Sequence, residues 1–174
     1  AVSSDNILSA SGSIKGVPFR ASYGFTSQQG ILKNTDLKRH SLNLNLTPTF
    51  LDNHLKVSAN VKASHVDNNF GEAGAVGSAI SYDPTQPVMS GTDDFRGYTT
   101  WSDVTASGTP NPVAQIDLTD NASKVNRILV NGEIEYKLHM FPDLKVVVNT
   151  GIDYSESDGH NRAPVDAEFT PVNN

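Results

Sequence analysis

The residues best suited to chemistry gather in one short segment, between positions 93 and 101. Asp93 and Asp94 precede the stretch FRGYTTW, which places Tyr98 and Trp101 close to the two carboxylates. Aromatic rings with a polar tip are common at recognition surfaces, and beside carboxylates they suit glycans or peptides. The pattern predicts a ligand-binding surface here. The alternative is that the rings only anchor a long loop.

Other chemistry is not indicated by the sequence. The chain has no cysteine, which excludes disulfides, thiolate metal sites and a cysteine nucleophile. No nucleophile elbow, phosphate-binding loop or dinucleotide fingerprint occurs. The stretch DNNFGE at 67–72 resembles a calcium loop faintly, without its ligand spacing or distal glutamate. No histidine forms an i,i+4 pair; the five are His40, His54, His65, His139 and His160. We therefore expect no enzyme, no cofactor and no metal.

The charge is distributed unevenly. The formal net charge is −6, which argues against nucleic acid as a partner. Residues 67–122 hold eight acids against one base, and residues 153–174 hold five against one. The remainder of the chain is therefore basic, and the acidic segments are expected on one side of the molecule.

Six segments alternate between apolar and polar residues, near 7–14, 19–26, 38–47, 54–65, 124–138 and 144–155. In HLKVSANVKASH (54–65), each apolar residue is followed by a polar or charged one. Side chains alternate across a strand, so each segment has one apolar face and one polar face. Membrane-crossing strands need about 9–11 residues, whereas ordinary strands peak near 5–6, and these runs fit the longer class.

Short and long connections alternate strictly along the chain. The short ones are 15–18, 48–53 and 139–143, and the long ones are 27–35, 66–122 and 156–174. This alternation is typical of a transmembrane β-barrel with tight periplasmic turns and extended outer loops. Both acidic segments then lie outside.

The fold class predicted is all-β: an antiparallel up-and-down meander of about six long strands, forming part of a transmembrane β-barrel. The loop 66–122 is expected to be irregular, with room for a short helix at 72–81. Periodicity alone does not separate this fold from a β-sandwich. The alternative function is therefore a soluble, secreted β-sandwich that binds carbohydrate through Tyr98 and Trp101.

Four stretches resemble one family. These are 30–64, GAVGSAISYDPTQPV (74–88), NPVAQ (111–115) and YKLHMFPDLKVVVNTGIDYS (136–155), and the likeness runs from about 5 to 160. They resemble early barrel strands of SusC/RagA-like TonB-dependent outer-membrane transporters. The resemblance implies import of oligosaccharides or peptides through a plugged barrel of roughly 22 strands. It also implies TonB, a surface lipoprotein lid and outer-membrane lipid as partners, and a bacterial outer-membrane location.

The chain is expected to be one partial barrel segment over 1–174, with the plug domain absent. It begins AVSSDN without an initiator methionine, as a chain with a cleaved signal or a piece of a longer protein would. Six strands cannot close a wide barrel, so both edges and the apolar face would be exposed. The isolated segment is therefore expected to curl, swap strands or self-associate.

Overall fold

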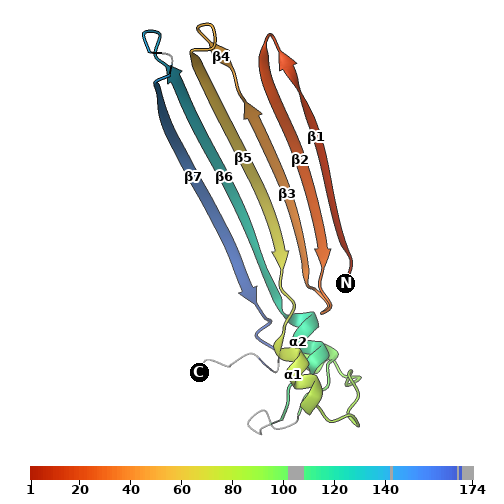
Figure 1. Cartoon of the computed structure of the whole chain (residues 1–174). Coiled ribbons are helices and arrows are strands. Elements are labelled where there is room, and N and C mark those ends of the chain that lie inside the picture. Colours follow the sequence, from red (N-terminus) through yellow and green to blue (C-terminus); the bar gives the residue numbers. More distant parts are fainter. Residues whose placement is uncertain (102–107, 142, 168, 170–174) are drawn as a thin grey trace.

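A single open sheet forms most of the molecule. The computed structural model describes residues 1–101, 108–141, 143–167 and 169. Figure 1 shows the long strands side by side, with two short helices beyond one end of the sheet. The strand order is β1-β2-β3-β5-β6-β7, with β4 paired to β5, and every pairing is antiparallel. The strands are β1 (Ser3–Ile14), β2 (Val17–Gln29), β3 (Asp36–Leu46), β4 (Thr49–Phe50), β5 (Leu55–Asn69), β6 (Asp120–Lys137) and β7 (Lys145–Arg162).

The register places the alternating apolar residues of the long strands on the same face of the sheet. Leu44 pairs with Val61, Val61 with Val130, and Val130 with Ile152, so four strands contribute to one apolar row. Because side chains alternate along each strand, rows two residues away repeat the pattern. The antiparallel meander predicted from the sequence is confirmed, and the sheet is not closed.

The apolar face of the sheet is uncovered. Among the described residues, the buried apolar side chains are the alanines Ala75, Ala114 and Ala167, and none of them lies in a strand. Ile152, near the middle of β7, is 69% exposed. The described residues contain no second sheet, so the β-sandwich alternative does not fit. No helix in the described part of the chain has the length and apolarity to cross a membrane.

The edges of the sheet are open. Within the described residues, β1 pairs only with β2, and β7 pairs only with β6. The backbone groups on the outer sides of these two strands therefore lack ladder partners, and the edges are long, at 12 and 18 residues. Such edges favour pairing with further strands.

Several strands extend further than the alternation predicted. The expected outer loop 156–174 is wrong for residues 156–162, which continue β7 to Arg162. Likewise β5 continues to Asn69, and β6 begins at Asp120, inside the loop expected over 66–122. These extensions carry polar residues on both faces, so they lack an apolar alternation. Cross-strand bonds hold them, such as that from His160 Nε2 to Asp120 Oδ2 at 3.0 Å.

The long connection between β5 and β6 is folded where it is described. It contains α1 (Gly74–Ser81), a 3₁₀ turn η1 (Asp94–Gly97) and α2 (Pro112–Leu118). The short helix expected at 72–81 is thus present as α1, whereas α2 was not predicted. Figure 1 places both helices at the end of the sheet opposite the tight β1–β2 and β6–β7 turns.

Candidate functional site

The apolar face forms a band of limited height. On β6 it runs from Ile128 to Tyr136, through the alternate residues Val130, Gly132 and Ile134. Eight steps along a strand span about 27 Å at ~3.4 Å per residue. With the usual tilt of ~40°, this gives a height of about 21 Å, close to the ~25 Å apolar band of outer-membrane barrels.

The end of the band near the helices is marked by polar groups on the same face. Directly beyond the row Leu42–Ala63–Ile128–Tyr154, the next row contains His40, His65, Asn126 and Glu156. The Tyr23 hydroxyl lies 2.7 Å from His40 Nδ1. Amphipathic aromatic residues commonly occupy membrane interfaces, and Tyr23 and Tyr154 lie at this level.

The other end of the band also has an aromatic border. Tyr136 ends the stripe on β6, and its hydroxyl lies 2.9 Å from His139 Nδ1. The His139 ring stacks on His54 with 3.9 Å between centroids. Phe50 and Phe141, in two of the three short connections at this end, are exposed. Two aromatic borders thus enclose the apolar band.

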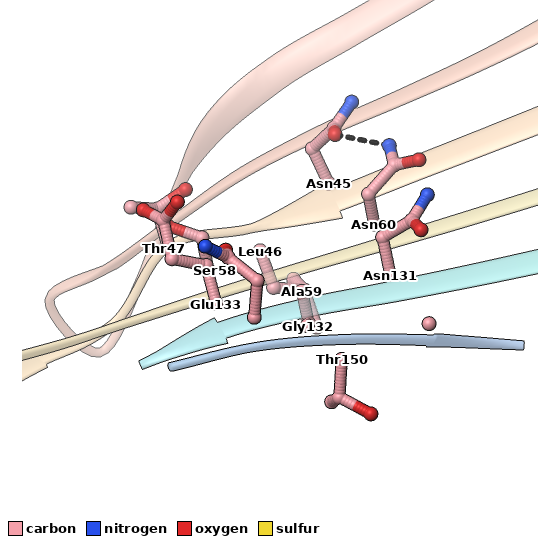
Figure 2. Close-up of a pocket in the computed structure, with 12 residues that line it drawn as sticks. Asn45, Leu46, Thr47, Ser58, Ala59, Asn60, Asn131, Gly132, Glu133 and Thr150 are labelled. Atoms are coloured by element: carbon pink, nitrogen blue, oxygen red, sulfur yellow. Dashed lines mark hydrogen bonds between the residues drawn. The ribbon is translucent and has the colours of Figure 1, made fainter. Parts of the chain in front are cut away.

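The opposite face of the sheet is polar and carries a hollow of about 560 Å³. Figure 2 shows Asn45, Asn60 and Asn131 projecting side by side from neighbouring strands. Asn60 Nδ2 donates to Asn43 Oδ1 at 2.9 Å and also to Asn45 Oδ1. Gly151 leaves space beside Asn131, because a Cβ there would lie 2.7 Å from Asn131 Oδ1. Amide groups both donate and accept, so this wall suits water and neutral polar solutes.

Asn111 holds together the connection between β5 and β6. Its side chain is buried, with 1% exposure, at the N-terminus of α2. Its Nδ2 donates to the carbonyls of Val88 at 2.9 Å and Thr99 at 3.2 Å. Its Oδ1 accepts from the backbone N–H groups of Val113 and Ala114 at 3.1 and 3.3 Å, which caps the helix. One amide therefore joins three separate parts of the loop.

Asp117 joins α2 to two other segments. Lys33 Nζ donates to its Oδ1 at 2.6 Å, and the Tyr98 hydroxyl donates to its Oδ2 at 3.1 Å. The hydrogen bond and the charge of Asp117 raise the pKa of Lys33. Burial, and then the hydrogen bond to Asp117, raise the pKa of Tyr98. The 30–35 connection is held further by Asn34 Nδ2, which donates to the Ile116 carbonyl at 2.9 Å.

The four residues predicted as a ligand surface lie in this connection. Asp93 and Asp94 are exposed at η1, and Tyr98 follows directly, half-buried with its hydroxyl on Asp117. Trp101 is half-buried, and its Nε1 donates to the Thr109 carbonyl at 2.9 Å. The polar tips of both aromatics thus anchor the loop, and the carboxylates of Asp93 and Asp94 are exposed. Ligand binding by these four residues stays a prediction.

Sequence reasoning missed the structural roles of Asn111 and Asp117. The Asn-Pro pair at 111–112 was a usable signal, since asparagine favours the N-cap and proline the first helical position. In the part of the chain that the structure describes, no group of three or more His, Asp or Glu residues could hold a metal ion.

Two curated proteins are similar to this chain. The TonB-dependent receptor SusC of Bacteroides thetaiotaomicron is 34% identical over 173 residues, covering 90% of this chain and 17% of that protein. The TonB-dependent receptor P26 of Formosa agariphila is 29% identical over 129 residues, covering 74% of this chain and 12% of that protein. No protein-family model matches.

An open antiparallel meander with an uncovered apolar band, together with these two matches, defines a TonB-dependent receptor of the bacterial outer membrane. Within that class, the chain belongs to the SusC-like receptors. It spans about a sixth of the length of SusC, so it corresponds to one segment of such a receptor.

Proposed function

We propose that this chain forms part of the barrel wall and of the outer mouth of a TonB-dependent nutrient importer. The uncovered apolar band carries the proposal, because its height fits a membrane and polar rows border it. The similarity to two TonB-dependent receptors supports a role in transport rather than in catalysis. The six long strands supply the wall, and their amide-lined polar face lines the lumen.

The loop between β5 and β6 supplies part of the mouth. It is the longest connection, and it lies at the same end of the sheet as the 30–35 connection that it contacts through Asp117. Long connections of outer-membrane barrels face outward. The acidic residues of this loop then face the surroundings of the cell, at the entrance to the pore.

The proposed substrates are oligosaccharides or peptides, and the proposed partners of the complete receptor are TonB and a surface lipoprotein lid. The family supports the partners, and the exposed Asp93 and Asp94 beside Tyr98 and Trp101 support the substrate class. The two exposed carboxylates offer hydrogen-bond acceptors at the mouth, and hydroxyl or ammonium groups of a substrate would donate to them.

A pair of neighbouring residues tests the wall assignment. In the complete receptor in lipid bilayers, a nitroxide label at Val130→Cys should collide with oxygen dissolved in the hydrocarbon. A label at Asn131→Cys, one residue along β6 on the other face, should collide instead with an aqueous nickel chelate. Accessibility measured by electron paramagnetic resonance distinguishes the two. Equal access of the nickel chelate to both positions would show that Val130 does not face lipid, and the wall assignment would be wrong.

Trp101 tests the ligand surface. Trp101→Ala should weaken the binding of the preferred solute by about tenfold, because a ring platform contributes on the order of 1–2 kcal/mol. Calorimetric titration of the complete receptor with a panel of oligosaccharides and peptides measures this. Trp101→Phe is the matched control, which keeps an aromatic ring in the loop and should retain most of the affinity. Unchanged affinity in Trp101→Ala removes the residue from the site.

A further inference from the structure

A second hollow lies on the polar face of the sheet, beside the amide-lined hollow of Figure 2 and on its side toward the helices. It measures about 340 Å³ and is lined by residues of β3, β5 and β6. The pair Asn43–Lys62 belongs to the row that follows the amide row directly, and Arg39 lies four residues further along β3. The hollow therefore opens on the face assigned to the lumen, close to the mouth.

Cationic side chains line this hollow, and none of its lining residues is acidic. The three cations are Arg39, Lys62 and Arg127, and all three side chains are exposed. Arg127 is neutralised by Asp153, because its Nε donates to Oδ1 at 2.9 Å and its Nη2 donates to Oδ2. The excess positive charge of the hollow is therefore carried by Arg39 and Lys62.

These two cations have no carboxylate partner. Within the described residues, the Lys62 ammonium makes neither a hydrogen bond nor an ion pair, and neither of its ladder neighbours is acidic. Arg39 Nη2 donates at 3.4 Å to the hydroxyl of Thr26, a neutral group. That hydroxyl donates to Asp5 Oδ1 at 2.8 Å, so Asp5 offsets Arg39 only across an intervening side chain. Lys62 in particular lacks a counter-charge.

Neutral donors accompany the two cations. Asn60 Nδ2 donates to Asn43 Oδ1 at 2.9 Å, so the oxygen of Asn43 is occupied and its Nδ2 is available to donate. Ser64 also lines the hollow, and its hydroxyl makes no hydrogen bond among the described residues. The hollow thus combines two charged donors with amide and hydroxyl donors.

Such a set of donors complements an anion that accepts several hydrogen bonds. A carboxylate is the anionic group that both proposed substrate classes can carry, in peptides at the C-terminus and in oligosaccharides on uronic acids. The connection between β5 and β6 has the opposite charge, because residues 67–122 hold eight acids against one base. The mouth and the hollow therefore suit different groups of one solute.

We propose that this hollow binds a carboxylate group of the imported solute. Lys62 and Arg39 supply the positive charge, and Asn43 Nδ2 and the Ser64 hydroxyl donate further hydrogen bonds. The inference rests on the proposed function, because it needs the polar face to line the lumen. It adds to that function a preference for solutes with an acidic group.

Two matched pairs of probes test the site by calorimetric titration of the complete receptor. One pair is a tripeptide of neutral residues with a free C-terminal carboxylate and the same tripeptide with a C-terminal amide. The other is trigalacturonic acid and its methyl ester. The unaltered receptor should bind the acid of at least one pair about tenfold more tightly than the neutral partner. The pair that shows the preference identifies the source of the carboxylate.

Variants assign this preference to the hollow. Lys62→Met combined with Arg39→Gln removes both unpaired charges, so the acid and its neutral partner should then bind equally. Lys62→Arg keeps the charge and should keep the preference. Lys56→Met is the matched control, because Lys56 lies on the same face of β5 but outside the hollow, opposite Glu135. It should leave the preference unchanged.

Two outcomes would overturn the carboxylate site: equal binding of acid and neutral partner in both pairs, or a preference that survives in Lys62→Met with Arg39→Gln. The nitroxide pair at Val130 and Asn131 separates this failure from failure of the wall assignment. A lipid-exposed label at 130 and an aqueous label at 131, combined with equal binding, reject the carboxylate site alone. An aqueous label at 130 rejects the wall assignment and the carboxylate site together.

Discussion

Replacement of Asn111 by alanine is expected to release the outer loop from its folded arrangement. The change removes two donors from the carbonyls of Val88 and Thr99, and it removes the N-cap of α2. The Val88 carbonyl keeps the backbone N–H of Thr99 at 3.0 Å, whereas the Thr99 carbonyl loses its donor from Asn111. The two lost hydrogen bonds and the lost cap together cost about 3 kcal/mol in local opening, roughly a hundredfold in the opening equilibrium. Amide hydrogen exchange of Val113 and Ala114 should accelerate by that factor.

A conservative change at the same position separates the two roles of the amide. Asn111→Asp keeps the acceptor that caps α2, but it replaces the two donated hydrogen bonds with an oxygen that faces two carbonyls. Exchange should therefore accelerate in the 88–99 region, while the cap is retained. Amides in the centre of β6 provide the internal control, because their ladder partners are on β5 and β7. Unchanged exchange in Asn111→Ala would show that other contacts hold the loop.

The second large effect is expected at Val130, which lies inside the apolar band, between its end at Ile128 and its centre at Gly132. Val130→Lys places an ammonium group on the face assigned to hydrocarbon, at a cost that reaches about 2–4 kcal/mol at the membrane midplane. The complete receptor should assemble poorly in the outer membrane and unfold at a lower urea concentration. Quantitative immunoblotting of outer-membrane fractions and urea unfolding in bilayers measure the two effects.

Asn131→Lys is the matched control for this prediction. It introduces the same charge one residue away, on the polar face beside Asn60 and the space left by Gly151. In an aqueous lumen the added charge remains hydrated, so the loss should be below about 1 kcal/mol. Similar losses for both variants would mean that the two faces of the sheet meet similar surroundings, and the wall assignment would be wrong.

The sequence predicted the strands best where one face is apolar. Between Leu55 and Ala63 every second residue is apolar, and this stretch lies within β5 as expected. The signal stops where the apolar band ends, because residues such as Asn68 and Ser157 lie where both faces of the sheet carry mainly polar residues. Strand continuation there depends on cross-strand pairing, such as Asn68↔Ser123, and pairing between distant residues leaves no local pattern.

The outer loop was less predictable for a related reason. Ala75 and its neighbours gave a helical pattern that the structure shows as α1. By contrast, α2 has only seven residues, too few for a periodic stripe, and its signal lay in the Asn-Pro start. The contacts from Asn111 to Val88 and from Asp117 to Lys33 join residues far apart in sequence, so composition and spacing did not indicate them.

The unpaired sides of β1 and β7 constrain how such a wall is built. In hydrocarbon each backbone N–H or C=O without a partner costs several kcal/mol, and these two edges present many of them. The free energy of inserting one hairpin at a time is therefore strongly unfavourable. The open sheet must enter the bilayer already paired with neighbouring strands, or an assembly factor must pair with its edges until those strands are in place. For the proposed barrel wall, assembly is therefore the stage at which these two edges must find partners.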